Sequence, residues 1–220
     1  MKIHFDLISD LHVDTWDEPF SWDGKATSLY AVVAGDISRE RSDIRPVLQE
    51  LSAHYKIVIF VDGNDEHRWT LDNLGDSYQT LKEEIHGINN VVWLQDNTVV
   101  IDNVAFVGVN GWTTFDFDND LSYQDSKRWM EERYRISMFA GQQIEALSMS
   151  DAGFLCKSVS KLQTHQDIKK IVVVTHFVPN VRLLRHDIEL EGTHALNSTG
   201  NSLLTRCIDE DHENKIHTWC

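Results

Sequence analysis

Residues 57–66 read Ile-Val-Ile-Phe-Val-Asp-Gly-Asn-Asp-Glu, an apolar run that ends in a cluster of polar side chains. The apolar part, Ile57–Val61, has the length and the branched and aromatic content that are typical of a buried strand. The polar part, Gly63–Glu66, follows almost without a spacer. Ligands of an open α/β sheet bind in the crevice outside the carboxyl ends of its strands. The stretch therefore predicts a buried strand with a binding site at its carboxyl end.

The same arrangement recurs elsewhere in the chain. Apolar runs at Ile3–Ile8, Tyr30–Ala34 and Ile171–Val174 each end in a short polar segment. These segments supply Asp10 and His12, then Gly35 and Asp36, and finally Thr175 and His176. Because the carboxyl ends of neighbouring strands meet at one edge of a sheet, side chains far apart in the sequence can converge there. The repeated pattern predicts one site built from several strand ends.

Helical and strand-like segments alternate around these runs. Apolar residues at helical spacing predict helices after Ser42–Asp43 and around Tyr78–Ile88. Residues 121–166 also have helical character, with breaks expected near Gly141 and Gly153. Short strands are expected at Val91–Leu94, Thr98–Ile101 and Val104–Val109, with a tight hairpin between the last two. The alternation predicts one α/β domain over residues 1–220, in which two mixed sheets pack face to face with helices outside.

The composition argues against several classes of protein. A net charge of -15 disfavours broad contact with a nucleic-acid backbone, which relies on clustered Lys and Arg. No apolar stretch reaches the ~18 residues of a membrane span, and the first residues lack the basic and apolar regions of a signal peptide. The three cysteines lack a C-x-x-C pair, so reduced cysteines in a cytoplasmic protein are expected rather than disulfides or a cysteine zinc site. The oligomeric state cannot be inferred from these features.

The polar residues at the strand ends match the ligands of divalent metal ions. Residues two apart in a strand point to the same side, so Asp10 and His12 can face one ion. Asp36 offers two oxygens and can bridge two ions ~3.5–4 Å apart. Asn64 supplies a carbonyl oxygen and His176 an imidazole nitrogen. The mixed set suits Mn²⁺, the expected ion, as well as Fe, Zn²⁺ or, less well, Mg²⁺, although each segment alone also fits an ordinary turn.

The segments Asp10-x-His12, Gly35-Asp36, Gly63-Asn64-x-Glu66 and Thr175-His176, in this order, resemble the calcineurin-like metallophosphoesterase superfamily. The resemblance covers nearly the whole chain and implies a four-layer αββα fold with two metal ions at one end of the sheets. It implies that Asp10 and His12 hold the first ion, that Asp36 bridges, and that Asn64 and His176 hold the second. It also implies hydrolysis of phosphate esters, in which a bridging hydroxide attacks phosphorus while the ions neutralise the phosphate oxygens.

Asp65 departs from the pattern of that superfamily, which has a histidine at this position. In the family that histidine stabilises the transition state and protonates the leaving oxygen, so Asn64 and Asp65 occupy the expected catalytic positions here. Nearby positive charge favours a carboxylate over its acid, so Asp65 is expected to be a poor proton donor that repels an incoming phosphate. His67 could supply the missing proton, but its place at a turn or helix start is expected to aim it elsewhere.

A second departure concerns the last residues of the chain. The family closes its site with Gly-His-x-His after a final core strand, and Lys215–Cys220 looks like that strand. The domain is therefore expected either to lack the Gly-His-x-His segment or to continue into it beyond Cys220. Without those two histidines, roughly three protein ligands remain for each ion, enough for an open but weaker site.

Other residues are candidates for substrate contact. The loop 111–115 resembles a loop over the metal centre in several members of the superfamily, although Trp112 and Phe115 fit core packing equally well. Arg39 could meet a phosphate as a planar fork or lie in solvent at a helix start. His186 and His194 fall in a loop region, where substrate-binding side chains often lie.

The sequence thus predicts a cytoplasmic, divalent-metal-dependent phosphoesterase that acts on a phosphate-ester substrate of unspecified identity. The alternative is a metal-binding or protein-binding member of the same fold without turnover, an interpretation that Asp65 and the missing histidines keep open. A nuclease is disfavoured by the acidic charge.

Overall fold

Two four-stranded sheets form the centre of the protein, in a computed structural model that describes residues 3–70, 73–117, 122–134, 138–184 and 194–220. The first sheet has the order β1 (Asp6–Ile8), β2 (Tyr30–Ala34), β3 (Ile57–Val61), β4 (Val91–Trp93) and is parallel throughout. The second has the order β5 (Asn97–Ile101), β6 (Val104–Val109), β7 (Lys170–Thr175), β8 (Ile216–Trp219), with only the β5–β6 pair antiparallel. The predicted α/β fold with two sheets is confirmed, although only the second sheet is mixed.

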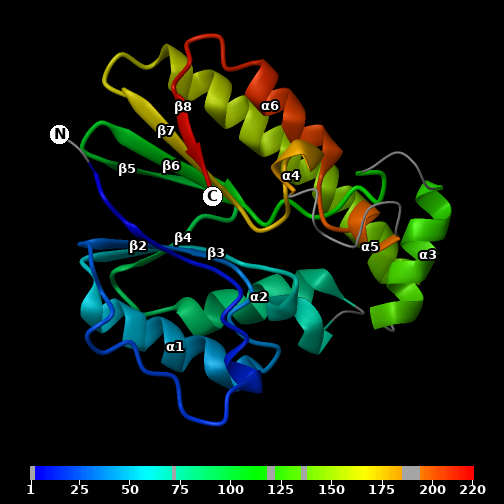
Figure 1. The fold of residues 1–220 in the computed structure, drawn as a ribbon, viewed down its shortest axis with the longest axis horizontal. Coiled ribbons are helices and arrows are strands. Elements are labelled where there is room, and N and C mark those ends of the chain that lie inside the picture. Colours follow the sequence, from blue (N-terminus) through cyan, green and yellow to red (C-terminus); the bar gives the residue numbers. More distant parts are fainter. Residues whose placement is uncertain (1–2, 71–72, 118–121, 135–137, 185–193) are drawn as a thin grey trace.

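Helices cover the outer faces of both sheets, so that the layers run helix, sheet, sheet, helix (Figure 1). The first sheet is covered by α1 (Arg41–His54) and α2 (Leu74–Ile85), and the second by α4 (Met138–Thr164) and α6 (Thr205–Asp209). The helices α3 (Tyr123–Tyr134) and α5 (His194–Asn197) lie together at one end of the molecule. In the described parts of the chain, short 3-10 turns join these elements: η1 (Val13–Thr15), η2 (Asp65–Thr70), η3 (Val181–Leu183) and η4 (Ser202–Leu204).

Strand β2 illustrates why the central strands are apolar on both faces. Alternate residues of a strand point to opposite sides of its sheet. Val32 and Ala34 therefore pack against Phe106 of the second sheet, whereas Ala31 and Val33 pack in the cluster beneath α1. A sheet covered on both sides has no face left for solvent. This burial explains the uninterrupted apolar runs and holds the ends of the strands in fixed positions.

The long helix α4 differs from the sequence-based expectation, because it passes without a break through both Gly141 and Gly153. A glycine inside a helix costs roughly 1 kcal/mol relative to alanine. Burial of Ile144, Leu155 and Val159 on the same helix outweighs that cost. At Gly141 an added Cβ would meet only the flexible ends of Glu131 and Lys127 of α3, so this glycine does not end the helix.

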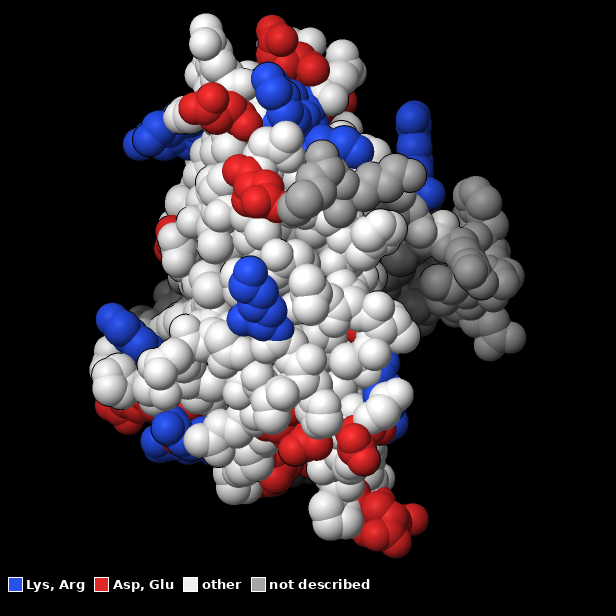
Figure 2. Space-filling model, turned by 90° about the vertical axis from the view of Figure 1, so that its left-hand side faces the viewer, with Lys and Arg blue, Asp and Glu red and all other residues white. Residues whose placement is uncertain are grey.

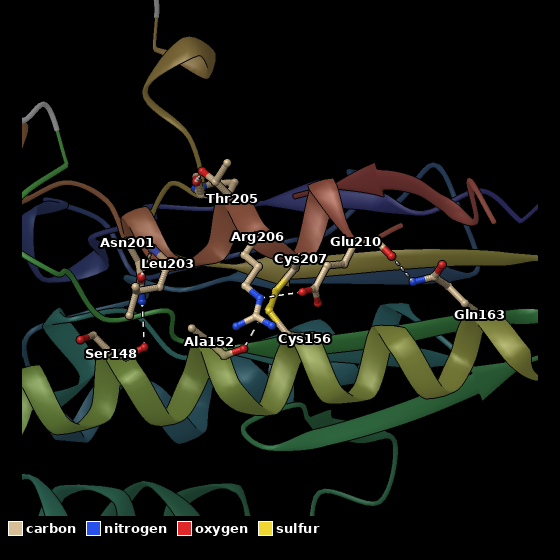
Figure 3. Close-up of a disulfide and its surroundings, with 11 residues drawn as sticks. Ser148, Ala152, Cys156, Gln163, Asn201, Leu203, Thr205, Arg206, Cys207 and Glu210 are labelled. Atoms are coloured by element: carbon tan, nitrogen blue, oxygen red, sulfur yellow. Dashed lines mark hydrogen bonds and ion pairs between the residues drawn. A yellow bond between two sulfur atoms is a disulfide. The ribbon is translucent and has the colours of Figure 1, made fainter. Parts of the chain in front are cut away.

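The expectation that all cysteines are reduced is wrong, because Cys156 of α4 and Cys207 of α6 form a disulfide (Figure 3). It lies between two hydrogen-bonded contacts of the same segments, from Asn201 to the carbonyl of Ser148 and from Gln163 to the carbonyl of Glu210. The two cysteines are 51 residues apart in sequence, so only the packing of α6 on α4 brings them together. Cys220 is a free, partly buried thiol whose pKa is raised by burial to about 11.

The surface and the helices bear on the predicted partners. Figure 2 shows a face on which, among the residues it describes, Lys and Arg side chains stand apart and are interspersed with Asp and Glu. Within the described ranges, none of the helices combines the length and the apolar character needed to cross a lipid bilayer. The absence of nucleic-acid binding and the cytoplasmic location stay predictions.

Removing the disulfide with Cys156→Ala/Cys207→Ala is expected to lower the free energy of unfolding by roughly 2–4 kcal/mol, because the cross-link restricts the unfolded chain. Urea titration of the non-reduced protein measures this change. Cys220→Ala is the control and should leave the disulfide intact. Thiol labelling in denaturant without reductant should modify one cysteine per chain, since the other two are paired; modification of all three would contradict the disulfide.

Candidate functional site

Polar side chains from four strand ends line one cavity of about 370 Å³. Asp10 and His12 follow β1, Asp36 follows β2, Asn64 and Asp65 follow β3, and His176 follows β7. These strands belong to both sheets, so the cavity opens where the two sheets meet at their carboxyl ends. The residues that the sequence analysis proposed as metal ligands are thus brought to one place.

Asp36 lies at the centre of this group, with a histidine on each side. Its Oδ2 is 3.8 Å from Nε2 of His12, and its Oδ1 is 3.5 Å from Nε2 of His176. Asp36 is 5% exposed. Burial raises the pKa of Asp36, the charge of His176 opposes this, and the neighbouring Asp65 and Asp10 add to it. Carboxylates that lie this close together attract a cation, which would offset their mutual repulsion.

Two sets of three side chains could each hold a metal ion, and Asp36 belongs to both. One set is Asp10, Asp36 and His176, and the other is His12, Asp36 and Asp65, with ligand atoms within 4.8 Å of one another. Asn64 lies beside the first set, with Oδ1 3.3 Å from Nε2 of His176. The grouping differs from the sequence-based one, which paired Asp10 with His12.

His12 provides an independent test of whether a cation fits. Its Nδ1 is buried and makes no hydrogen bond to the residues that the structure describes, although Asp65 Oδ2 is 3.2 Å away. A buried ring nitrogen without a hydrogen bond is costly unless a ligand satisfies it. Imidazole and carboxylate donors together suit divalent cations of the first transition series. The donors present therefore fit a bound divalent ion.

The backbone at the site adopts a conformation that is uncommon for residues other than glycine. Asp10, His12 and Asp36 have φ angles of 52°, 44° and 55°. Asp and His enter this left-handed region more readily than most residues, and such outliers cluster at functional sites. The loops are held together by backbone bonds from Asp10 N to Gly35 O (3.0 Å) and from His12 N to Asp36 O (3.1 Å).

Glu66 belonged to the sequence motif without an assigned role, and it links the loops that follow β2 and β3. Its fully buried carboxylate accepts hydrogen bonds from Asp36 N at 2.9 Å and Gly63 N at 2.6 Å. Burial, together with the charge of Asp36, raises the pKa of Glu66 to about 8. The loops after β2 and β3 are thus joined through one side chain that does not line the cavity.

Two glycines permit these loops to touch. Gly35 has a φ of +87°, and a Cβ added there would lie 2.7 Å from the Cα of Gly63 and from Nδ1 of His176. A Cβ added to Gly63 would collide with the carboxylate of Asp36. Real Cβ atoms almost never come within 3.0 Å of such neighbours, so both positions require glycine.

His67 is turned away from the cavity, into a buried network that the sequence analysis missed. Its Nε2 is 2.8 Å from Asp62 Oδ2 and its Nδ1 is 2.7 Å from Ser77 Oγ. Trp93 Nε1 donates to the other oxygen of Asp62 at 2.6 Å. Burial by itself raises the pKa of Asp62, but the bond and charge of His67 outweigh it and lower the pKa. The proton-donating role considered for His67 is therefore not supported by its position.

The remainder of the cavity wall is apolar on one side and basic on another. Trp112, Trp129, Met130, Ile144 and Phe177 supply apolar surface, and Arg39 and Arg68 supply guanidinium groups. Phe115 and Trp112 are both buried in the same core cluster, so the core-packing alternative fits both residues. His194 is bonded to Ser126 Oγ at 3.1 Å rather than lining the cavity, and His186 lies outside the described residues.

Asp151 of α4 holds the loop that carries Trp112. Its fully buried carboxylate accepts hydrogen bonds from Gly111 N at 2.8 Å, Trp112 N at 3.3 Å and Gln95 Nε2 at 3.1 Å. Burial raises the pKa of Asp151 from the ordinary 3.8 to about 7. No local sequence pattern predicts this contact, because Asp151 lies in a helix far along the chain from the loop that it supports.

Comparison with known proteins identifies a similar fold. Neither a protein-family model nor a curated protein matches the chain. Among solved structures, the crystal structure of phosphopantetheinyl hydrolase (PptH) from Mycobacterium tuberculosis is similar, with a TM-score of 0.65 and 19% sequence identity. The similarity covers 90% of this chain and 75% of that chain. At this identity the comparison shows the shared fold and nothing finer.

The family assignment made from the sequence is corrected by these findings. No family model of this superfamily matches the chain, and the similar structure is described as a phosphopantetheinyl hydrolase, a different hydrolase family. The physical reason lies in the motifs themselves. Each consists of two to four residues at the end of a buried strand, and turn-forming Gly, Asp and Asn are common there. Such segments predict convergent strand ends without specifying a family.

Gly63→Ala is expected to displace the Asp36 carboxylate and to weaken Mn²⁺ binding by roughly tenfold or more, since one methyl group occupies the place of a ligand. Calorimetric titration with Mn²⁺ measures the affinity. Gly153→Ala is the matched control, because a Cβ at that helical position meets nothing within 4 Å. Unchanged Mn²⁺ affinity in Gly63→Ala would show that Asp36 is not a ligand.

The free energy of unfolding should fall between pH 5 and pH 8, and Asp151→Asn should reduce that fall. A carboxyl whose pKa rises on folding binds more protons in the folded state, so its stabilising contribution is lost as pH increases from about 4 to about 7. Each pH unit within this window costs about 1.4 kcal/mol at most. Urea titrations at both pH values measure the fall. Asp167→Asn, at an exposed position, is the control; an equal fall in wild type and Asp151→Asn would contradict the assignment.

Proposed function

We propose that the protein is a divalent-metal-dependent hydrolase of phosphate esters. One observation carries the proposal: carboxylate, imidazole and amide groups from four strand ends surround Asp36 in a single cavity. The similar structure supports it, since that protein is described as a phosphopantetheinyl hydrolase. Many reactions occur on shared folds, so the argument depends on the donors in this chain.

Two metal ions would be held by the residues around Asp36. Asp10 and His176 would complete one site together with Asn64, His12 would complete the other, and Asp36 would serve both. Mn²⁺ is the ion that this mixture of oxygen and nitrogen donors suits best, with Fe, Zn²⁺ and Mg²⁺ as the other candidates. Bound ions of this kind neutralise phosphate oxygens and activate water for attack on phosphorus.

The protein's own contribution is to hold these donors rigidly at the end of the sheets. The buried strands fix the positions of the ligand loops, and Glu66 fixes the separation of the loops that carry Asp36 and Asn64. A rigid set of donors does not have to reorganise when charge develops on the phosphate. Trp112 and Phe177 line the cavity beside these donors.

Asp36→Asn is expected to lower the content of bound Mn²⁺ and to reduce kcat/KM for p-nitrophenyl phosphate and its diester by roughly 10² or more, because this carboxylate contacts both ligand sets. Elemental analysis and a colorimetric assay measure the two effects. Asp17→Asn, at an exposed position outside the cavity, is the control.

Two results would count against the proposal. Equal Mn²⁺ content in wild type and Asp36→Asn would contradict the placement of the metal site. A wild-type protein that binds Mn²⁺ yet hydrolyses neither monoesters nor diesters would instead favour a metal-binding module without turnover.

A further inference from the structure

Asp65 is surrounded by donors in the cavity wall. Asp65 is 2% exposed; its carboxylate accepts hydrogen bonds from Arg39 Nε at 2.9 Å and Asn64 Nδ2 at 3.0 Å, and it forms an ion pair with Arg68, whose Nε is 3.1 Å away. Nδ1 of His12 lies 3.2 Å from the same carboxylate. An ionised carboxylate has about four lone-pair directions for hydrogen bonds. These neighbours leave Asp65 little capacity to bind a metal ion as well, even though it lies in one of the two ligand sets.

The contacts of Asp65 orient Arg39 toward the cavity. Arg39 uses Nε for Asp65, and its Nη groups make no hydrogen bond to the residues that the structure describes. Its side chain is 48% exposed, whereas that of Asp65 is 3% exposed. A guanidinium group held at Nε still presents donors in a planar fork that matches two oxygens of a phosphate. Arg68, paired with the other oxygen of Asp65, also lines the cavity.

The charge of this group differs from what Asp65 alone would suggest. An isolated aspartate beside the metal ligands would repel a phosphate, which was the expectation from the sequence. Here the two guanidinium groups pair with the carboxylate at hydrogen-bond distance and offset its charge. The guanidinium groups of Arg39 and Arg68 therefore favour phosphate binding at this part of the cavity. It adjoins Asp36, whose Oδ1 accepts a hydrogen bond from Asp65 N at 2.9 Å.

The cavity also indicates what kind of organic group accompanies the phosphate. Beyond the charged residues its wall consists of Trp112, Trp129, Met130, Ile144 and Phe177. Met130 and Ile144 come from α3 and α4, and Phe177 directly follows the ligand His176. Apolar and aromatic side chains that line a cavity stabilise an apolar ligand by removing it from water.

We propose that Arg39, positioned by Asp65 and assisted by Arg68, binds the phosphate group of the substrate, and that the substrate is a phosphate ester with an apolar organic group in the neighbouring part of the cavity. This inference rests on the proposed function for its reaction but not for its binding site. Asp65 is a positioning residue in this arrangement and donates no proton.

Calorimetric titration of the Mn²⁺-loaded chain with inorganic phosphate tests the arginine site. Arg39→Ala should weaken phosphate binding by roughly tenfold or more, with partial recovery in Arg39→Lys, because lysine keeps the charge without the fork. Arg41→Ala is the matched control: its side chain is 49% exposed and is paired with Glu84 outside the cavity. Phosphate affinity in Arg39→Ala equal to that of wild type would overturn the proposal.

Asp65→Asn separates a positioning role from metal ligation. It should weaken phosphate binding while the Mn²⁺ content stays equal to that of wild type. In an Arg39→Ala/Arg68→Ala background the same change should have little further effect on phosphate binding, because residues that act through one another are not additive. Loss of Mn²⁺ in Asp65→Asn would make Asp65 a metal ligand and overturn its positioning role.

Two phosphonates that cannot be hydrolysed as esters test the apolar part of the proposal. Phenylphosphonate should bind to the Mn²⁺-loaded protein roughly tenfold more tightly than methylphosphonate, because its ring removes apolar surface from water. Equal affinities would overturn the predicted substrate class. All these measurements record binding, so a wild-type protein that shows the expected pattern but hydrolyses no ester would refute the proposed reaction and leave the binding site intact.

Discussion

The buried carboxylate of Glu66 joins the two loops that the rest of the site depends on. It accepts backbone N–H groups from Asp36 and Gly63, and thereby fixes the distance between the carboxyl ends of β2 and β3. A buried carboxylate is tolerated when backbone donors satisfy it, and leaving those donors unpaired would be costly. Gly35 and Gly63 make the contact sterically possible. The position of Asp36, and through it both ligand sets, follows from this brace.

Charge balance is the second constraint on the site. Asp10, Asp36 and Asp65 lie close together, and burial, with the charges of Asp65 and Asp10 adding to it, raises the pKa of Asp36. The negative charges of these carboxylates are balanced in two different ways. Arg39 and Arg68 offset Asp65, whereas Asp10 and Asp36 remain beside histidines as donors for cations. A single change at Asp65 would disturb this division more than its distance from the reacting atoms suggests.

The strand ends could be predicted from the sequence because their signals are local. An apolar run such as Ile57–Val61 and the polar residues directly after it fix both the strand and the edge of the sheet at which its ligands lie. The pairing of Cys156 with Cys207 could not be predicted, because it depends on how α6 packs against α4. The glycines of α4 were misinterpreted for a similar reason, since tertiary burial overrode their local propensity.

The family was misassigned because short sequence motifs carry only local information, whereas the side chains around a site are brought together by the tertiary fold. The motifs describe how strands end, and chains that share this fold can place different side chains around the same ligands. Asp65 stands where the sequence analysis expected a histidine. It pairs with Arg39, 26 positions before it, and with Arg68, three positions after it. The three side chains come together only when the chain folds. The character of the site therefore lies in that cluster of charges. In the folded chain the carboxylate of Asp65 pairs with both guanidinium groups at the cavity.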